Sequence, residues 1–261
     1  MVTQQGILHF ETYGRGRPVL LLHGWLGSWA LWRNSFEVLG QSKYQLKVYA
    51  LDFFGFGESS NKSDEFSVRN FVNLVNEFMD RQGIQKAALV GHSMGGTVSL
   101  TVAIEHPERV AKAVVIGSPV NGASLSWLLK LSGNPGFANL IWTFPNLVYL
   151  FLRGYSYFMA NDGAAMEKMV TSDLSKVSVK PFFQSIATLG ATDLRQQVEG
   201  LTLPVMGIYG PKDIIVSPNQ AKVLKKHIPH ARVEWFENSG HFPMMDEPER
   251  FHTVLVDFLN N

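Results

Sequence analysis

The chain has 261 residues, a formal net charge of +1 from 23 Lys and Arg against 22 Asp and Glu, and no cysteine. This length suits one large domain or a domain with an insertion, which buries enough surface to fold without disulfides. The scattered, balanced charge argues against a nucleic-acid-binding protein, because phosphate binding requires clustered Lys and Arg. The absence of cysteine excludes a disulfide scaffold, a cysteine-ligated zinc site and a cysteine nucleophile.

The first ten residues contain neither the charged n-region nor the apolar h-region of a signal peptide. Together with the cysteine-free composition, this predicts a cytoplasmic protein.

Short apolar runs alternate with helical patterns along most of the chain. The expected strands cover residues 19–23, 46–52, 87–91, 113–117, 205–210 and 232–236, after a strand-like segment near residue 9. The expected helices cover residues 29–39, 68–82, 97–106, 219–227 and 249–259, the last with Asp246 as its cap and Pro248 in its first turn. This alternation predicts an α/β fold with a mostly parallel central sheet flanked by helices on both faces. Ligands of such sheets bind beyond the carboxyl ends of the strands.

Residues 122–199 break this alternation. They contain no strand pattern and read as several helices rich in leucine and aromatic residues, separated by Gly, Pro and Asn. We therefore expect a helical cap (122–199) inserted into a core formed by residues 1–121 and 200–261. Such a cap either lines a pocket for an apolar group or only packs its own core. Its stretch 136–152 is too short and too interrupted to span a bilayer, but it raises the hypothesis of contact with a membrane surface.

The most informative motif is Gly91-His92-Ser93-Met94-Gly95, which lies between an expected strand and an expected helix. A serine in this context sits on a tight, strained turn that presents its hydroxyl as a nucleophile. The five residues alone also fit an incidental glycine-rich turn, so the partners of Ser93 decide between the two interpretations.

His241 is the predicted base for Ser93, because it follows the last expected strand and precedes the last helix, at the same edge of the sheet. His92 adjoins the serine but is expected to point away from it on the tight turn. Other histidines are expected in structural or surface positions: His9, His106, His227, His230 and His252.

Asp213 is the predicted acid that orients this base. It directly follows the expected strand 205–210, and the order Ser, Asp, His along the chain is the order expected for this layout. A turn-forming aspartate is the alternative interpretation of Asp213. Asp52 also ends an expected strand, but the loop that follows it favours a structural role. No carboxylate follows the strand 113–117.

Acyl transfer also requires fixed N–H donors where negative charge develops on the carbonyl oxygen. We expect one from the backbone of Met94, directly after the nucleophile. The other is expected from the backbone of Trp25, in the turn after the first core strand. The alternative interpretation of that turn is a glycine turn with a core tryptophan.

Taken together, these segments resemble the α/β-hydrolase fold family, in particular its cap-bearing esterases, lipases, C–C bond hydrolases, lactonases and cofactor-free haloperoxidases. The matching segments are 23–25 for the oxyanion loop, 52–59 for the loop after the next strand, 91–96 for the nucleophile turn, 210–213 for the acid and 240–248 for the base. The resemblance covers residues 7–121 and about 200–261, and the cap resembles nothing assignable.

The resemblance implies a serine hydrolase that cleaves carboxylic esters through the triad Ser93, His241 and Asp213, with no metal and no cofactor. The apolar cap favours a small apolar or lipid-like ester as the substrate. Serine as the nucleophile argues against the dehalogenase and epoxide hydrolase branches, and His92 favours esterases over C–C hydrolases. The alternatives are a C–C hydrolase, a lactonase or a perhydrolase with the same triad, and a binding module without catalysis. The sequence leaves the natural substrate and the oligomeric state open.

Overall fold

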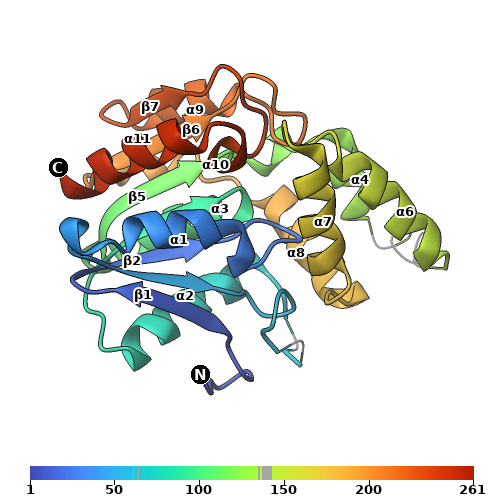
Figure 1. Ribbon diagram of the computed structural model, residues 1–261, viewed down its shortest axis with the longest axis horizontal. Helices are drawn as coiled ribbons and strands as arrows, with labels where there is room; N and C mark the ends of the chain where they lie inside the picture. The colour runs from blue at the N-terminus through green and yellow to red at the C-terminus, as the bar shows by residue number, and fades with distance from the viewer. Residues whose placement is uncertain (61, 64, 135, 137–142) are drawn as a thin grey trace.

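A seven-stranded sheet forms the centre of the protein, in the order β1-β3-β2-β4-β5-β6-β7 (Figure 1). The computed structural model describes residues 1–60, 62–63, 65–134, 136 and 143–261. Strand β1 pairs antiparallel to β3, and all other neighbouring strands are parallel. The strands are β1 (Phe10–Gly14), β2 (Arg17–Leu22), β3 (Leu46–Leu51), β4 (Ala87–His92), β5 (Val110–Ile116), β6 (Val205–Tyr209) and β7 (Arg232–Trp235). The predicted α/β fold with a mostly parallel sheet is therefore confirmed.

Helices cover both faces of the sheet, as the continuous apolar strands predict. Alternate residues of β2 show this: Leu20 and Leu22 belong to one buried cluster, while Val19 and Leu21 belong to the other. The first cluster includes side chains of α2 (Val68–Arg81), α3 (Met94–Glu105) and α9 (Gln220–His227). The second includes side chains of α1 (Arg33–Leu39) and α11 (Pro248–Asn260). Short 3-10 helices η1 (Trp29–Trp32), η2 (Ser42–Tyr44) and η3 (Pro107–Arg109) complete this part of the chain.

Two expectations about the last helix are wrong. Asp246 does not cap α11, because it lies in the short helix α10 (Pro243–Asp246) and its carboxylate accepts hydrogen bonds from the N–H groups of Gly240 and Asn161. His252 is not a solvated surface residue. Its Nε2 lies 3.0 Å from the hydroxyl of Ser35 on α1, and burial lowers its pKa.

The chain between β5 and β6 is helical. It contains η4 (Gly122–Ser124), α4 (Trp127–Ser132), α6 (Pro145–Ser156), α7 (Gly163–Leu174), α8 (Val179–Ala191) and η5 (Gln197–Gly200). Helices α4, α6, α7 and α8 lie together beyond one end of the sheet (Figure 1). We call residues 122–199 the cap segment. Across the described ranges, no helix has the length and apolar character that crossing a membrane requires.

Candidate active site

Ser93 lies on a sharp turn between β4 and α3, with a positive φ of 51°. A side chain at Gly91 would collide with the backbone of Gly95, and one at Gly95 would collide with the carbonyl oxygen of Leu22. The chain can therefore make this turn only with glycines on both sides of the serine. The turn gives Ser93 the strained backbone that is typical of a nucleophile elbow.

A cavity of about 540 Å³ lies against Ser93 and His241. The structure brings both predicted residues to the wall of this one cavity. Ser93 Oγ has no hydrogen-bond partner among the described residues, so the two side chains are not joined by a hydrogen bond. Such bonds are often long or poorly aligned before substrate binds.

Asp213 meets His241, as the sequence predicts. Its Oδ2 lies 2.7 Å from His241 Nδ1, and both side chains are almost completely buried. Its other oxygen, Oδ1, accepts hydrogen bonds from the N–H groups of Ile215 at 2.8 Å and Val216 at 2.9 Å. The two backbone donors fix the carboxylate, which in turn fixes the orientation of the imidazole.

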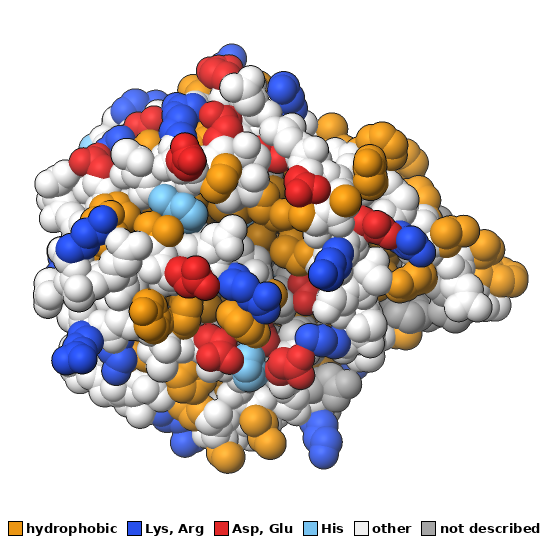
Figure 2. Space-filling view, viewed as in Figure 1, with side chains coloured by type: hydrophobic (Ala, Val, Ile, Leu, Met, Phe, Trp, Pro, Cys, Tyr) orange, Lys and Arg blue, Asp and Glu red, His pale blue; other side chains and the backbone are white. Residues whose placement is uncertain are grey.

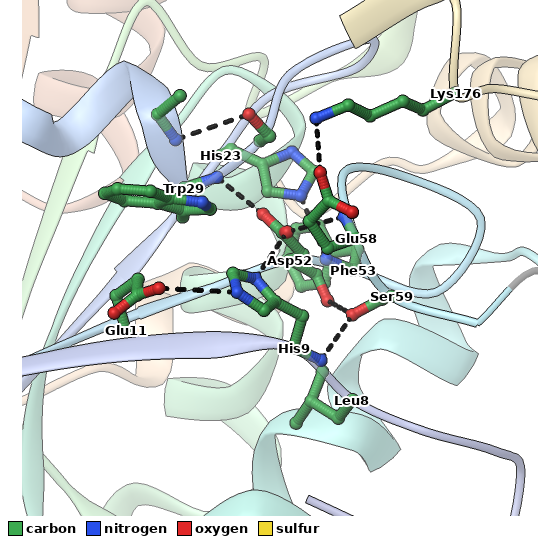
Figure 3. Close-up of polar contacts among 12 residues, drawn as sticks. Leu8, His9, Glu11, His23, Trp29, Asp52, Phe53, Glu58, Ser59 and Lys176 are labelled. Carbon is green, nitrogen blue, oxygen red and sulfur yellow. Dashed lines mark hydrogen bonds and ion pairs between the residues drawn. The ribbon is translucent and has the colours of Figure 1, made fainter.

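Asp52, the rival acid, has a different environment, shown in Figure 3. Its carboxylate accepts hydrogen bonds from the N–H groups of Trp29 at 2.6 Å and Glu58 at 2.9 Å, and it lies 2.8 Å from His9 Nδ1. Asp52 does not line the cavity, and the ring nitrogen of His241 that an acid would orient is already bound by Asp213. Asp52 therefore organises the loop after β3, which agrees with its expected structural role.

The loop after β2 approaches the elbow closely. A side chain at Gly24 would press against His92 and Ser93, at 2.8 and 3.0 Å. His23 holds this loop, because its Nδ1 donates to the Gly24 carbonyl at 2.7 Å and its Nε2 accepts from the N–H of Phe53 at 2.9 Å. Burial lowers the pKa of His23, so it stays neutral with its proton on Nδ1.

The backbone N–H groups of Trp25 and Met94 have no acceptor within the described part of the chain, which leaves both available for a ligand. The indole of Trp25 has a separate role that the sequence did not reveal. Its Nε1 donates to the carbonyl of Phe182 on α8 at 2.8 Å, and the two rings pack edge to face. The loop after β2 is thus tied to the cap segment.

His92 does not point away from the site, contrary to expectation. It lines the cavity, and its ring lies against that of His241, with centroids 4.7 Å apart. Its Nε2 donates to the carbonyl oxygen of His241 at 2.9 Å, so Nδ1 carries no proton. Burial, and then the charge of His241, lowers the pKa of His92 well below its ordinary value. His92 is therefore a neutral donor that holds the backbone of the predicted base.

The cavity wall is mostly apolar. Among its described residues, side-chain nitrogen and oxygen atoms come from Trp25, His92, Ser93, Ser132, Tyr155 and His241, and none of these residues is Asp, Glu, Lys or Arg. The cap segment supplies much of the apolar wall, through Leu128, Leu129, Phe144, Leu147, Phe151, Leu152, Phe182, Ile186 and Leu189. Within the described ranges, His, Asp and Glu side chains form no group of three suited to a metal ion.

Comparison with known proteins identifies the family to which this fold belongs. The family model described as "alpha/beta hydrolase fold" matches residues 17–248. A pimeloyl-[acyl-carrier protein] methyl ester esterase of Aliivibrio fischeri (strain MJ11) is 28% identical over 260 residues, covering 97% of each chain. A 2-hydroxymuconate semialdehyde hydrolase of Pseudomonas sp. (strain CF600) is 29% identical over 267 residues, covering 94% of this chain and 88% of that protein.

Solved structures give the same result for the fold. An esterase from Exiguobacterium antarcticum superposes with a TM-score of 0.83 at 22% identity, covering 98% of both chains. The matched segment in the family comparison spans most of the sequence. The predicted family is therefore confirmed, and the chain belongs to the alpha/beta hydrolase fold family.

Proposed function

We propose that this protein is a serine hydrolase that cleaves neutral carboxylic esters with an apolar acyl or alcohol group. The observation that carries the proposal is the cavity of about 540 Å³, whose mostly apolar wall includes both Ser93 and His241. The 2.7 Å contact between His241 and Asp213 supports a triad with Ser93. The methyl ester esterase among the relatives supports the same reaction class.

In the proposed mechanism, Ser93 Oγ attacks the ester carbonyl while His241 Nε2 takes the hydroxyl proton. Asp213 accepts the Nδ1–H of His241, which fixes the tautomer and stabilises the imidazolium. The backbone N–H groups of Trp25 and Met94 bind the oxyanion. His241 then protonates the leaving alcohol. A water molecule, deprotonated by the same imidazole, attacks the acyl-enzyme, and the acid leaves as Ser93 regains its proton.

The cavity wall favours neutral substrates over charged ones. Placing a carboxylate among apolar side chains without a cationic partner costs several kcal/mol, and the described residues of the wall include no Lys or Arg. Lactones, C–C bonds beside a carbonyl and transfer of the acyl group to peroxide remain alternatives that use the same residues. A neutral ester is the substrate class that the lining favours.

A fluorophosphonate probe and a series of p-nitrophenyl esters test the proposal. Wild-type protein should be labelled and Ser93→Ala should not, with turnover reduced at least ten-thousand-fold and an unchanged melting temperature. Each added methylene should raise kcat/KM about fourfold until the cavity is full, because burying a CH₂ group contributes about 0.8 kcal/mol. Wild-type protein that resists labelling would instead indicate a binding module.

A further inference from the structure

Helix α6 exposes large apolar side chains to solvent at the edge of the molecule. We call Leu147, Tyr149, Leu150 and Phe151 of α6, with Tyr157 and Phe158 after it, the apolar tip. Phe158 is 76% exposed and Leu150 is 63% exposed. Figure 2 shows hydrophobic side chains gathered at the end of the molecule where α6 lies in Figure 1. Proteins in aqueous solution rarely keep such a patch uncovered without a function for it.

The exposed side chains lie on two opposite sides of α6. Successive residues of a helix are rotated by about 100°, so Leu147, Leu150 and Phe151 occupy one half of the circumference and Tyr149 the other. A flat protein partner would cover one side of the helix. A fluid apolar medium, into which a projecting element sinks, would contact all of them. The distribution therefore favours a lipid layer over a second folded surface.

The charge around the apolar tip fits the same medium. Residues 122–159 contain no Asp or Glu, and their only charged residues are Lys130 and Arg153. Arg153 forms an ion pair with Glu167 on α7, while Lys130 has no ion-pair partner in the described part of the chain. Carboxylates at a bilayer surface are repelled by anionic headgroups, and exposed lysines are attracted to them. Aromatic side chains such as Tyr149, Tyr157 and Phe158 are favoured at the boundary of headgroups and acyl chains.

The apolar tip is continuous with the cavity. Leu147 and Phe151 line the cavity and are also 63% and 51% exposed. An apolar surface thus runs from the outside of α6 into the cavity that Ser93 also lines. We propose that the apolar tip inserts into the outer layer of a lipid bilayer with anionic headgroups, and that ester substrates enter the cavity from that layer. The second part of this inference rests on the proposed ester hydrolysis, and the first part does not.

Vesicle co-sedimentation of the full chain tests the inference, with vesicles of phosphatidylcholine alone and of equal parts phosphatidylcholine and phosphatidylglycerol. The test variant is Leu150→Ser/Phe158→Ser, because neither residue lines the cavity. The matched control is Val2→Ser/Ile7→Ser, which removes side chains that are 71% and 63% exposed far from the cap segment in sequence. Wild type and the control should sediment, more strongly with the anionic vesicles. The tip variant should partition at least tenfold more weakly.

Activity measurements distinguish a loss of membrane binding from a loss of ester hydrolysis. The tip variant should hydrolyse p-nitrophenyl acetate in solution at the wild-type rate and should lose rate only on a long-chain ester dissolved in the vesicles. Ser93→Ala should still sediment, so a failure of the proposed hydrolysis would leave the binding result intact. Wild type that stays in the supernatant with both vesicles would overturn the inference. A concentration-dependent dimer that Leu150→Ser/Phe158→Ser abolishes, without vesicle binding, would assign the patch to a second copy.

Discussion

The two walls of the cavity are held in different ways. On the core side, His241 is fixed at its imidazole by Asp213, at its carbonyl by His92 and at the N–H of the preceding residue by Asp246. On the cap side, α6 packs on α7 and leaves side chains such as Leu147 more than half exposed. Groups proposed for the chemistry are thus anchored by hydrogen bonds to the main chain. Groups that shape the substrate space are held mainly by apolar packing.

The most damaging change on the core side is Asp213→Asn. The amide would stabilise the wrong tautomer of His241, so we expect kcat to fall by three to four orders of magnitude. The measurement is steady-state hydrolysis of a p-nitrophenyl ester, with circular dichroism to show that the fold is kept.

Asp52→Asn is the matched control for that change. It removes acceptor capacity from the loop after β3, so we expect a lower melting temperature with kcat within a few-fold of wild type. The acid assignment is wrong if Asp213→Asn keeps its rate while Asp52→Asn loses it.

An intermediate effect is expected at His92. His92→Phe keeps a ring against His241 but removes the N–H that donates to its carbonyl, and we expect kcat to fall about tenfold with KM nearly constant. His92→Gln places an amide N–H near the same position and should recover most of this loss. Equal activity of the Phe variant and wild type would show that the hydrogen bond does not position the base.

The last change is expected to act on stability, with the smallest effect on the rate, and it concerns the attachment of the cap segment to the core. Asp173 on α7 accepts a hydrogen bond from Ser28 at 2.8 Å, while its other oxygen is buried without a partner among the described residues. Its pKa is raised from 3.8 to about 6, mainly because the carboxyl group is buried. The charges of Asp52 and Glu58 contribute to this rise, whereas the hydroxyl of Ser28 and the charge of Lys176 oppose it.

The folded protein therefore binds a proton at Asp173 that the unfolded chain releases, so stability should decrease as pH rises from about 4 to about 6. Asp173→Asn should remove that slope and raise the free energy of unfolding above pH 7 by up to about 3 kcal/mol. Chemical denaturation of both proteins at pH 4.5 and pH 7.5 measures the free energies of unfolding from which this difference is obtained. An unchanged slope in the variant would place the titrating group elsewhere.

The sequence could predict the residues at strand ends because topology alone brings them together. Ser93, Asp213 and His241 each follow a parallel strand, and the carboxyl ends of parallel strands share one edge of the sheet. The helical character of the cap segment was predictable for a similar reason, since it depends on local pattern.

The contacts that sequence reasoning missed depend on partners distant in the chain. The ring of His92 is oriented by its hydrogen bond to the carbonyl of His241, 149 residues away in the chain. The carboxylate of Asp246 binds the backbone N–H of Asn161 instead of capping the last helix. No local pattern specifies either partner.

The hydrogen bond from the Trp25 indole to the Phe182 carbonyl couples the position of α8 to the proposed oxyanion site. The same residue that offers its backbone N–H to the proposed oxyanion is fastened by its side chain to α8. If α8 moved away from the core, this hydrogen bond would break, and the backbone N–H of Trp25 would no longer be held in place. In the proposed mechanism the oxyanion would then be bound less well, so hydrolysis would depend on α8 remaining in contact with Trp25.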